Sequence, residues 1–112
     1  MRKLIVMALV VGCLGVLASV AMAASRSVKV GDNYYVRSKG VPTVTVSKGT
    51  KVKWRFGTGT PHTVTVKSGP AKFNSGPRSS GSYSRTLKKR GTYVIYCTIH
   101  GLSDQRMKLV VK

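Results

Sequence analysis

Hydrophobic and polar residues alternate along most of the chain with a period of two, which is typical of strands that bury one face. The clearest such segments are 41–46, 51–56, 62–66, 82–87, 92–97 and 107–111. Gly or Pro residues separate them, and none of them resembles a helix longer than a turn or two. The pattern therefore predicts a small all-β protein, built as an antiparallel sandwich or barrel.

The N-terminal segment has a different pattern. A short basic start, Met1–Lys3, precedes a nearly continuous apolar run, and small residues stand at Ala21 and Ala23. These features predict a secretory signal over residues 1–23 and one exported domain over 24–112, in the periplasm, outside the cell or at the cell envelope. The run is about long enough to span a bilayer, so an uncleaved membrane anchor is the alternative. A lipoprotein cleavage box ending at Cys13 is less favoured, because the following residues stay apolar.

Charge changes the expected partners. The chain has 20 Lys and Arg residues but only 2 acidic residues. Since Arg2 and Lys3 fall in the signal, residues 24–112 keep 18 basic residues and both aspartates, a net charge of +16. This charge predicts an acidic partner or an anionic membrane or envelope surface. The basic residues form no aromatic-rich stripe, so we do not expect binding to a specific nucleic acid. We expect the protein to be a monomer.

The candidate chemistry rests on very few residues. If cleavage removes Cys13, Cys97 is the only cysteine, so no internal disulfide is available, and His62 and His100 are the only histidines. One thiol and two imidazoles are the three strong ligands of a blue-copper electron-transfer centre. A buried cysteine acting as a small hydrophobe is the simpler alternative. Zinc also binds such residues, but copper binds them more tightly.

Strand alternation predicts where these side chains point. His62 falls on the inner face of its strand, while Thr63 falls toward water. Cys97 ends its strand facing inward, and His100 follows three residues later in a loop, close enough for both to meet one ion. The same count places Arg85 on an inner face, which indicates a sheet edge where the guanidinium reaches solvent.

Three segments in order resemble the cupredoxins, and among them the plastocyanin and amicyanin branch: 46–54, 61–64 and 91–101. The resemblance extends from about Val28 to Lys112. It implies a Greek-key β-sandwich of seven or eight strands with copper at one end. It also implies an exported blue-copper carrier that shuttles single electrons between redox partners through Cu(I) and Cu(II). The equatorial ligands it implies are His62, Cys97 and His100.

The fourth, axial position departs from the family pattern. Plastocyanin-like members usually have Met five residues after the second histidine, and that spacing falls here on Gln105. Counting back from the C-terminal strand gives the same result, and alternation puts both Gln105 and Met107 inward. We favour Gln105 as the axial ligand, because Gln is a known axial donor in such sites. Met107 is the alternative, delivered by a loop two residues longer, and the simpler interpretation of Gln105 is a polar loop residue that hydrogen-bonds the backbone.

The resemblance also implies routes for the electron. The exposed edge of His100, with Leu102 beside it, is the expected short exit, and Tyr96 on the outer face is the longer one. Thr63 and Thr98 each follow a ligand directly, so their backbone or hydroxyl groups are expected to bond the thiolate or the neighbouring loop.

Two other functions remain open. One is copper binding or storage without redox traffic, and the other is a basic polyanion-binding module on a cupredoxin scaffold. An enzyme is not expected, because two acidic residues do not supply a serine–histidine–acid set, and one copper site without further histidines does not suggest an oxidase.

Overall fold

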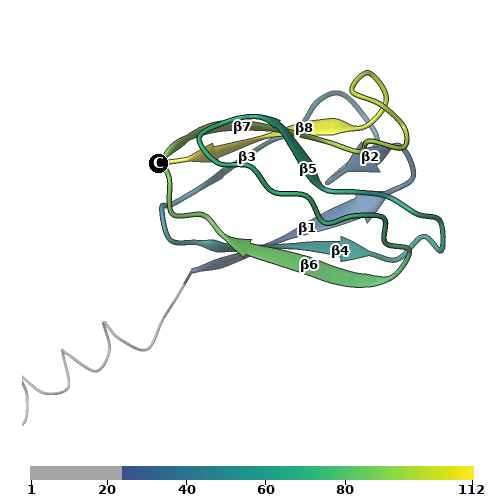
Figure 1. Ribbon diagram of the computed structural model, residues 1–112, viewed down its shortest axis with the longest axis horizontal. Helices are drawn as coiled ribbons and strands as arrows, with labels where there is room; N and C mark the ends of the chain where they lie inside the picture. Colours follow the sequence, from purple (N-terminus) through teal and green to yellow (C-terminus); the bar gives the residue numbers. More distant parts are fainter. Residues whose placement is uncertain (1–23) are drawn as a thin grey trace, which may run out of the picture.

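The fold was analysed in a computed structural model that describes residues 24–112, so the expected signal or anchor at 1–23 lies outside the described residues. Two four-stranded sheets face each other (Figure 1). The strands are β1 Ser25–Gly31, β2 Tyr34–Tyr35, β3 Thr43–Val46, β4 Lys51–Phe56, β5 Thr65–Ser68, β6 Gly81–Thr86, β7 Gly91–Tyr96 and β8 Arg106–Val111. The expected all-β sandwich is confirmed.

The strand order shows how distant segments meet. One sheet has the order β2-β1-β4-β6 and the other has the order β3-β8-β7-β5. Two of the pairs, β1 with β4 and β3 with β8, are parallel, so the sandwich is not purely antiparallel as the alternation had suggested. Alternation reports which face of a strand is buried, and it carries no information on the direction of the neighbouring strand.

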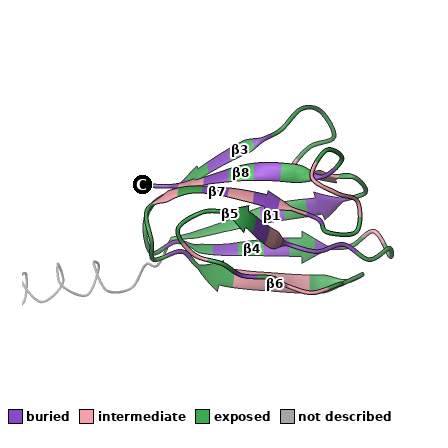
Figure 2. Ribbon diagram, turned by 45° about the horizontal axis from the view of Figure 1, so that its top comes forward, coloured by how far each residue is buried: buried purple, intermediate pink, exposed green. Residues whose placement is uncertain are grey.

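The core lies between the two sheets. Val52, Trp54 and Phe56 of β4 point inward and are buried, whereas the basic residues that alternate with them are exposed (Figure 2). The Trp54 ring packs against Phe73 and Tyr83, with ring centroids 5.8 and 6.2 Å apart. Burying each such side chain contributes about 1.5–3 kcal/mol relative to leaving it exposed, and this gain favours the face-to-face packing of the two sheets.

The segment around His62 differs from its expected strand. β5 begins at Thr65, and His62 instead forms an isolated antiparallel bridge with Arg78. Thr63 is buried, with 1% of its surface exposed, so the prediction that it faces water was wrong. The chain between His62 and Thr65 is not a regular strand, and strict alternation therefore does not hold there.

One further difference and one confirmed prediction concern the first sheet. The alternating pattern did not mark β1 or β2, because β1 buries residues only in its second half. The expected sheet edge at Arg85 is confirmed, since β6 is the last strand of its sheet. The Arg85 guanidinium lies 5.1 Å from the centre of the Phe73 ring, a cation–π contact that lets an inward position carry a charge.

The strands run between two ends of the sandwich (Figure 1). One end carries Ala24, the β6–β7 turn and the C-terminus, and the other carries the loops that follow β4 and β7. Residues 24–112 form two complete four-stranded sheets that enclose one hydrophobic core, which is the organisation of a domain that folds by itself. Across 24–112 the structure contains no helix of the length and apolarity needed to cross a membrane.

Candidate metal centre

The loops at one end of the sandwich bring three donor side chains together. His62 precedes β5, where backbone hydrogen bonds to Arg78 of 3.0 and 2.9 Å hold it in place. Cys97 directly follows β7, and His100 lies in the next loop. Their nearest ligand atoms all lie within 4.8 Å of one another. The sequence predicted this grouping, and the structure places the three side chains as one cluster.

A tight turn returns His100 over Cys97. The Gly101 N–H donates to the Cys97 carbonyl at 2.9 Å, and the Gln105 N–H donates to the Gly101 carbonyl at 3.1 Å. Gly101 has a φ of 89°, which residues other than glycine rarely adopt. The turn leaves His100 Nδ1 3.4 Å from Cys97 Sγ and stacks the two imidazoles, with ring centroids 4.8 Å apart.

The sulfur is buried and bonded from the His62 side. Cys97 has none of its surface exposed, and the Thr63 N–H lies 3.4 Å from its Sγ in donor geometry. Thr63 Oγ1 accepts the Thr98 N–H at 2.9 Å, which ties the segment of the first histidine to the loop of the second. The hydrogen bonds expected of Thr63 and Thr98 are therefore present. The Tyr35 hydroxyl adds a 2.6 Å bond to the Thr63 carbonyl, and burial raises the pKa of this phenol.

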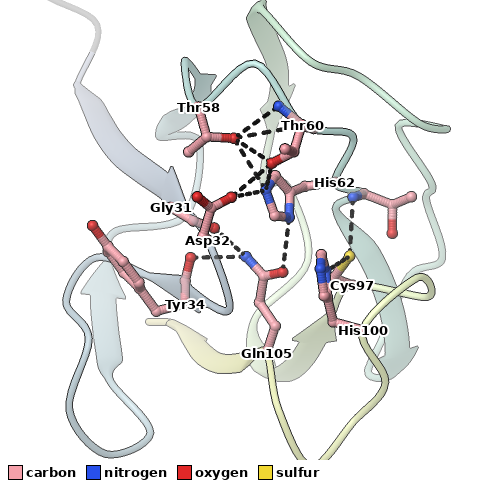
Figure 3. Close-up of polar contacts among 10 residues, drawn as sticks. Gly31, Asp32, Tyr34, Thr58, Thr60, His62, Cys97, His100 and Gln105 are labelled. Carbon is pink, nitrogen blue, oxygen red and sulfur yellow. Dashed lines mark hydrogen bonds and ion pairs between the residues drawn. The ribbon is translucent and has the colours of Figure 1, made fainter.

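Gln105 is oriented by its own amide protons. Its side chain is fully buried, and Nε2 donates to the carbonyls of Gly31 at 2.9 Å and Tyr34 at 2.8 Å (Figure 3). Because carbonyls only accept, the amide nitrogen must face them and the amide oxygen must face the cluster. Oε1 accordingly lies 3.1 Å from His62 Nδ1.

Met107 is also buried and inward, as expected, but it lies deeper in the sandwich. It is paired with Ile95 in the β7–β8 ladder. Gln105 instead lies opposite Cys97, whose N–H donates to the Gln105 carbonyl at 3.1 Å. One pair of residues along the ladder therefore separates Met107 from the level of the thiol.

The other ring nitrogen of His62 faces a polar cluster that no sequence motif indicated. Asp32 Oδ1 lies 3.0 Å from His62 Nε2, and the hydroxyls of Thr60 and Thr58 lie at 3.1 and 3.2 Å. The Thr60 hydroxyl also donates to Asp32 at 2.7 Å. The Thr60 hydroxyl first and the His62 ring second hold the pKa of the Asp32 carboxyl below its usual value.

The donor set fits one ion of intermediate softness. A cysteine sulfur and two imidazoles suit copper in both of its oxidation states, and a neighbouring amide oxygen is a weak fourth donor. The expected exit residues lie beside this set. His100, Leu102 and Gly101 are partly exposed, and Ile99 has 49% of its surface exposed. Tyr96, the second expected exit, ends β7 and is also partly exposed.

Solved structures share this fold and define the class of protein. A methionine-to-glutamine variant of amicyanin in the Cu(I) form is 28% identical, with a TM-score of 0.65, over 80% of this chain and 83% of that one. An oxidised proline-to-glycine variant of amicyanin is 30% identical, with a TM-score of 0.63, over 85% and 88%. No family model and no curated protein sequence matches the chain.

The chain therefore belongs to the cupredoxin family, as its motifs indicated. Within that family it is similar to amicyanin. Its three clustered side chains form a candidate site for a single copper ion.

Proposed function

We propose that this protein is an exported blue-copper electron carrier, with one copper held by His62, Cys97, His100 and, axially, Gln105. The observation that carries the proposal is the buried cluster of one sulfur and two imidazoles within 4.8 Å, in a chain of the cupredoxin family. Bound copper would supply the one-electron change between Cu(II) and Cu(I). The residues of the chain would supply the fixed donors and the exit.

The scaffold supports rapid electron exchange by restraining the donors. His62 is bonded through its backbone to Arg78, and Cys97 is bonded to Gln105 across the β7–β8 ladder. Side chains held on rigid elements keep their geometry better than side chains on loops alone. Little therefore has to move when the oxidation state changes, which favours a carrier over a storage protein.

Gln105 is the better candidate for the axial donor. Its amide oxygen already faces His62 Nδ1 at 3.1 Å, and its nitrogen is occupied by two backbone carbonyls. Met107 lies two pairs of residues further along the ladder than Gln105, with the pair Tyr96 and Arg106 between them. An amide oxygen is a harder donor than a thioether and stabilises Cu(II), so we expect a low reduction potential for the family.

The surface beside His100 suits electron exit. The imidazole is partly exposed, and its neighbours Ile99 and Leu102 are uncharged and reach solvent. Such a patch lets a partner approach without desolvating a charge. The partner would be an acidic redox protein or would lie at an anionic membrane or envelope surface, because residues 24–112 combine 18 basic residues with 2 acidic ones.

An absorption spectrum of the purified domain with Cu(II) tests the metal site. We expect one copper per chain and an intense blue band from thiolate-to-copper charge transfer, which Cys97→Ser should abolish. A Cys97→Ser variant that stays blue would overturn the assignment. Fast, reversible electron exchange with a small redox dye would then separate a carrier from a copper-storage protein.

A further inference from the structure

Six of the 18 basic residues of 24–112 lie at the end of the sandwich opposite the metal centre. These exposed cations lie in two turns, at the start of β4 and at the chain end, and define what we call the basic pole: Lys48, Lys51, Lys88, Lys89, Arg90 and Lys112. Backbone hydrogen bonds hold these segments together. The Lys48 N–H donates to the Lys112 carbonyl at 2.8 Å, and the Gly49 N–H donates to the Leu87 carbonyl at 2.7 Å.

The two acidic residues lie at the other end. Asp32 contacts the metal cluster through His62, and Asp104 lies in the loop that carries His100. The strand β8 separates Asp104 from Lys112, roughly 25 Å at about 3.3 Å per residue. This separation is more than twice the Debye length of about 10 Å at 0.1 M salt, so the carboxylates do not neutralise the basic pole.

The chain also enters the sandwich at the basic pole. The Lys51 N–H donates to the Ala24 carbonyl at 3.0 Å, so residue 24, which directly follows the apolar run of the sequence, lies beside these cations. Clusters of Lys and Arg next to an apolar segment favour anionic lipid headgroups. We propose that the basic pole docks on an anionic lipid bilayer and leaves the metal centre facing away, free for redox partners.

This inference extends the proposed function, because it assigns the anionic partner surface to lipid. Binding can be measured without copper, on residues 24–112, so a failure of the copper assignment would leave the result intact. The assay is co-sedimentation with vesicles of phosphatidylcholine alone or mixed with phosphatidylglycerol, at about 0.1 M salt. We expect the domain to bind the mixed vesicles and not the neutral ones.

Two variants of equal charge separate the basic pole from net charge. Lys88→Gln/Lys89→Gln/Arg90→Gln removes three cations of the pole, and Arg37→Gln/Lys39→Gln/Arg106→Gln removes three exposed cations near the metal end. The first should weaken vesicle binding on the order of a hundredfold, and the second by less than about fivefold. Equal losses, or equal binding to neutral vesicles, would overturn the proposal. No binding to either vesicle would overturn it too, in favour of an acidic protein partner.

A second inference rests on a different observation, the contact between Asp32 and His62. A metal-bound histidine commonly donates its other ring N–H to a carboxylate, which fixes the ring and raises its basicity. Here Asp32 Oδ1 lies 3.0 Å from Nε2, while Nδ1 points toward Gln105 and the thiol (Figure 3). The structure assigns Asp32 as a positioning residue that holds His62 Nδ1 toward the metal and favours Cu(II).

The geometry around Asp32 supports this role. Its carboxylate is 63% exposed, yet the hydroxyl of Thr60 donates to it at 2.7 Å and also lies beside the His62 ring. The turn that carries Asp32 also supplies the Gly31 and Tyr34 carbonyls that orient Gln105. One turn between β1 and β2 therefore contacts two of the four donor residues.

The other acidic residue provides a matched control. Asp32→Asn and Asp104→Asn change the net charge equally, but the Asp32 carboxylate contacts a donor side chain, whereas Asp104 is an exposed loop residue that precedes Gln105 in the chain. We expect Asp32→Asn to weaken Cu(II) binding relative to Cu(I) severalfold, up to about tenfold, which is 59 mV for one electron. Asp104→Asn should change this ratio by less than twofold.

A metal-free readout tests positioning itself. In the metal-free protein, nitrogen NMR of His62 should show a hydrogen-bonded proton on Nε2 in the parent, and Asp32→Ala should shift that proton toward Nδ1, which faces the acceptor oxygen of Gln105. Equal potential shifts in Asp32→Asn and Asp104→Asn would mean that Asp32 acts only through net charge. An unchanged His62 spectrum in Asp32→Ala would likewise overturn the assignment.

Discussion

The two histidines of the metal centre lie in opposite surroundings. His62 is fully buried, and each of its ring nitrogens lies within 3.1 Å of an oxygen, one from Gln105 and the other from Asp32. His100 lies in a loop, is partly exposed, and has Cys97 as the polar partner of its Nδ1. We infer a division of roles in which His62 fixes the metal and its potential, while His100 passes the electron to the surface.

The largest test of this difference removes each imidazole in turn. His62→Gly leaves a buried space that Asp32, Thr58 and Thr60 separate from solvent, whereas His100→Gly opens a gap at the surface. We expect both variants to lose the blue band, and added imidazole to restore it only in His100→Gly. Absorption titration with imidazole measures the outcome. Equal restoration of the blue band in both variants would show that the two histidine positions are equally accessible, which would contradict the proposed difference between them.

Replacing the proposed axial ligand tests how the buried half of the site sets the reduction potential. Gln105→Met should raise the reduction potential clearly, because a thioether favours Cu(I) more than an amide oxygen does. It should also cost about 1–3 kcal/mol of stability for each carbonyl left without a donor, those of Gly31 and Tyr34. Voltammetry and thermal unfolding measure the two effects.

Met107→Leu is the matched variant at the other inward position of the same strand. It preserves apolar volume, so we expect less than about 1.5 kcal/mol of destabilisation and an almost unchanged potential. A potential that responds to Met107→Leu and ignores Gln105→Met would show that the sulfur is the axial donor. The longer loop would then deliver Met107, and the favoured assignment would be wrong.

Much of the buried half of the site could be predicted from the sequence. Gln105 and Met107 were placed inward by alternation, and Cys97 was placed at the end of an inward-facing strand. Alternation works there because β7 and β8 are regular over six residues each. It failed at Thr63, where the chain leaves the ladder and the residue turns into the core.

Asp32 shows what local pattern does not encode. It is 30 residues from His62, and it reaches that ring only because β1 and β4 pair in parallel and bring both segments to one end. The signals available were a Gly31–Asn33 turn and the rarity of acidic residues, 2 in the whole chain. Neither signal indicates which residue Asp32 contacts, because contacts between distant segments depend on the order of the strands in the sheets.

A smaller effect is expected at the exposed side. Leu102→Ala removes apolar surface beside His100 without touching a donor, so the potential should stay constant while electron transfer to a partner slows severalfold. Stopped-flow kinetics with a natural or acidic redox partner, at several salt concentrations, measures the rate. With a net charge of +16 the rate should fall as salt rises.

Tyr96→Phe provides the companion variant, because Tyr96 is the second expected exit. If the electron leaves through His100, Tyr96→Phe should leave the rate within about twofold while Leu102→Ala slows it. The reverse pattern would move the exit to the outer face of β7. An electron-transfer rate that does not depend on salt in any variant would mean that the charge serves docking on the lipid bilayer and not association with the redox partner.

The smallest expected effect concerns the link between the two histidine segments. Thr63 Oγ1 accepts the Thr98 N–H at 2.9 Å and lies 3.2 Å from the Thr98 hydroxyl. Thr63→Val keeps the volume but removes this acceptor, which should cost about 0.5–1.5 kcal/mol of stability. The backbone bond from Thr63 to the sulfur remains, so the potential should hardly change.

Thr63→Ser is the control that restores the hydroxyl, and it should recover part of the stability lost in Thr63→Val. The decisive measurement is the rate of conformational exchange of the His100 ring, by NMR of the Cu(I) protein. Loss of the hydrogen bond between Thr63 and Thr98 should loosen the loop that carries His100 and leave His62 unaffected. If both rings loosen together, the two segments form one rigid unit. The different surroundings of the histidines would then set their exposure but not their mobility, and the division of roles would rest on burial alone.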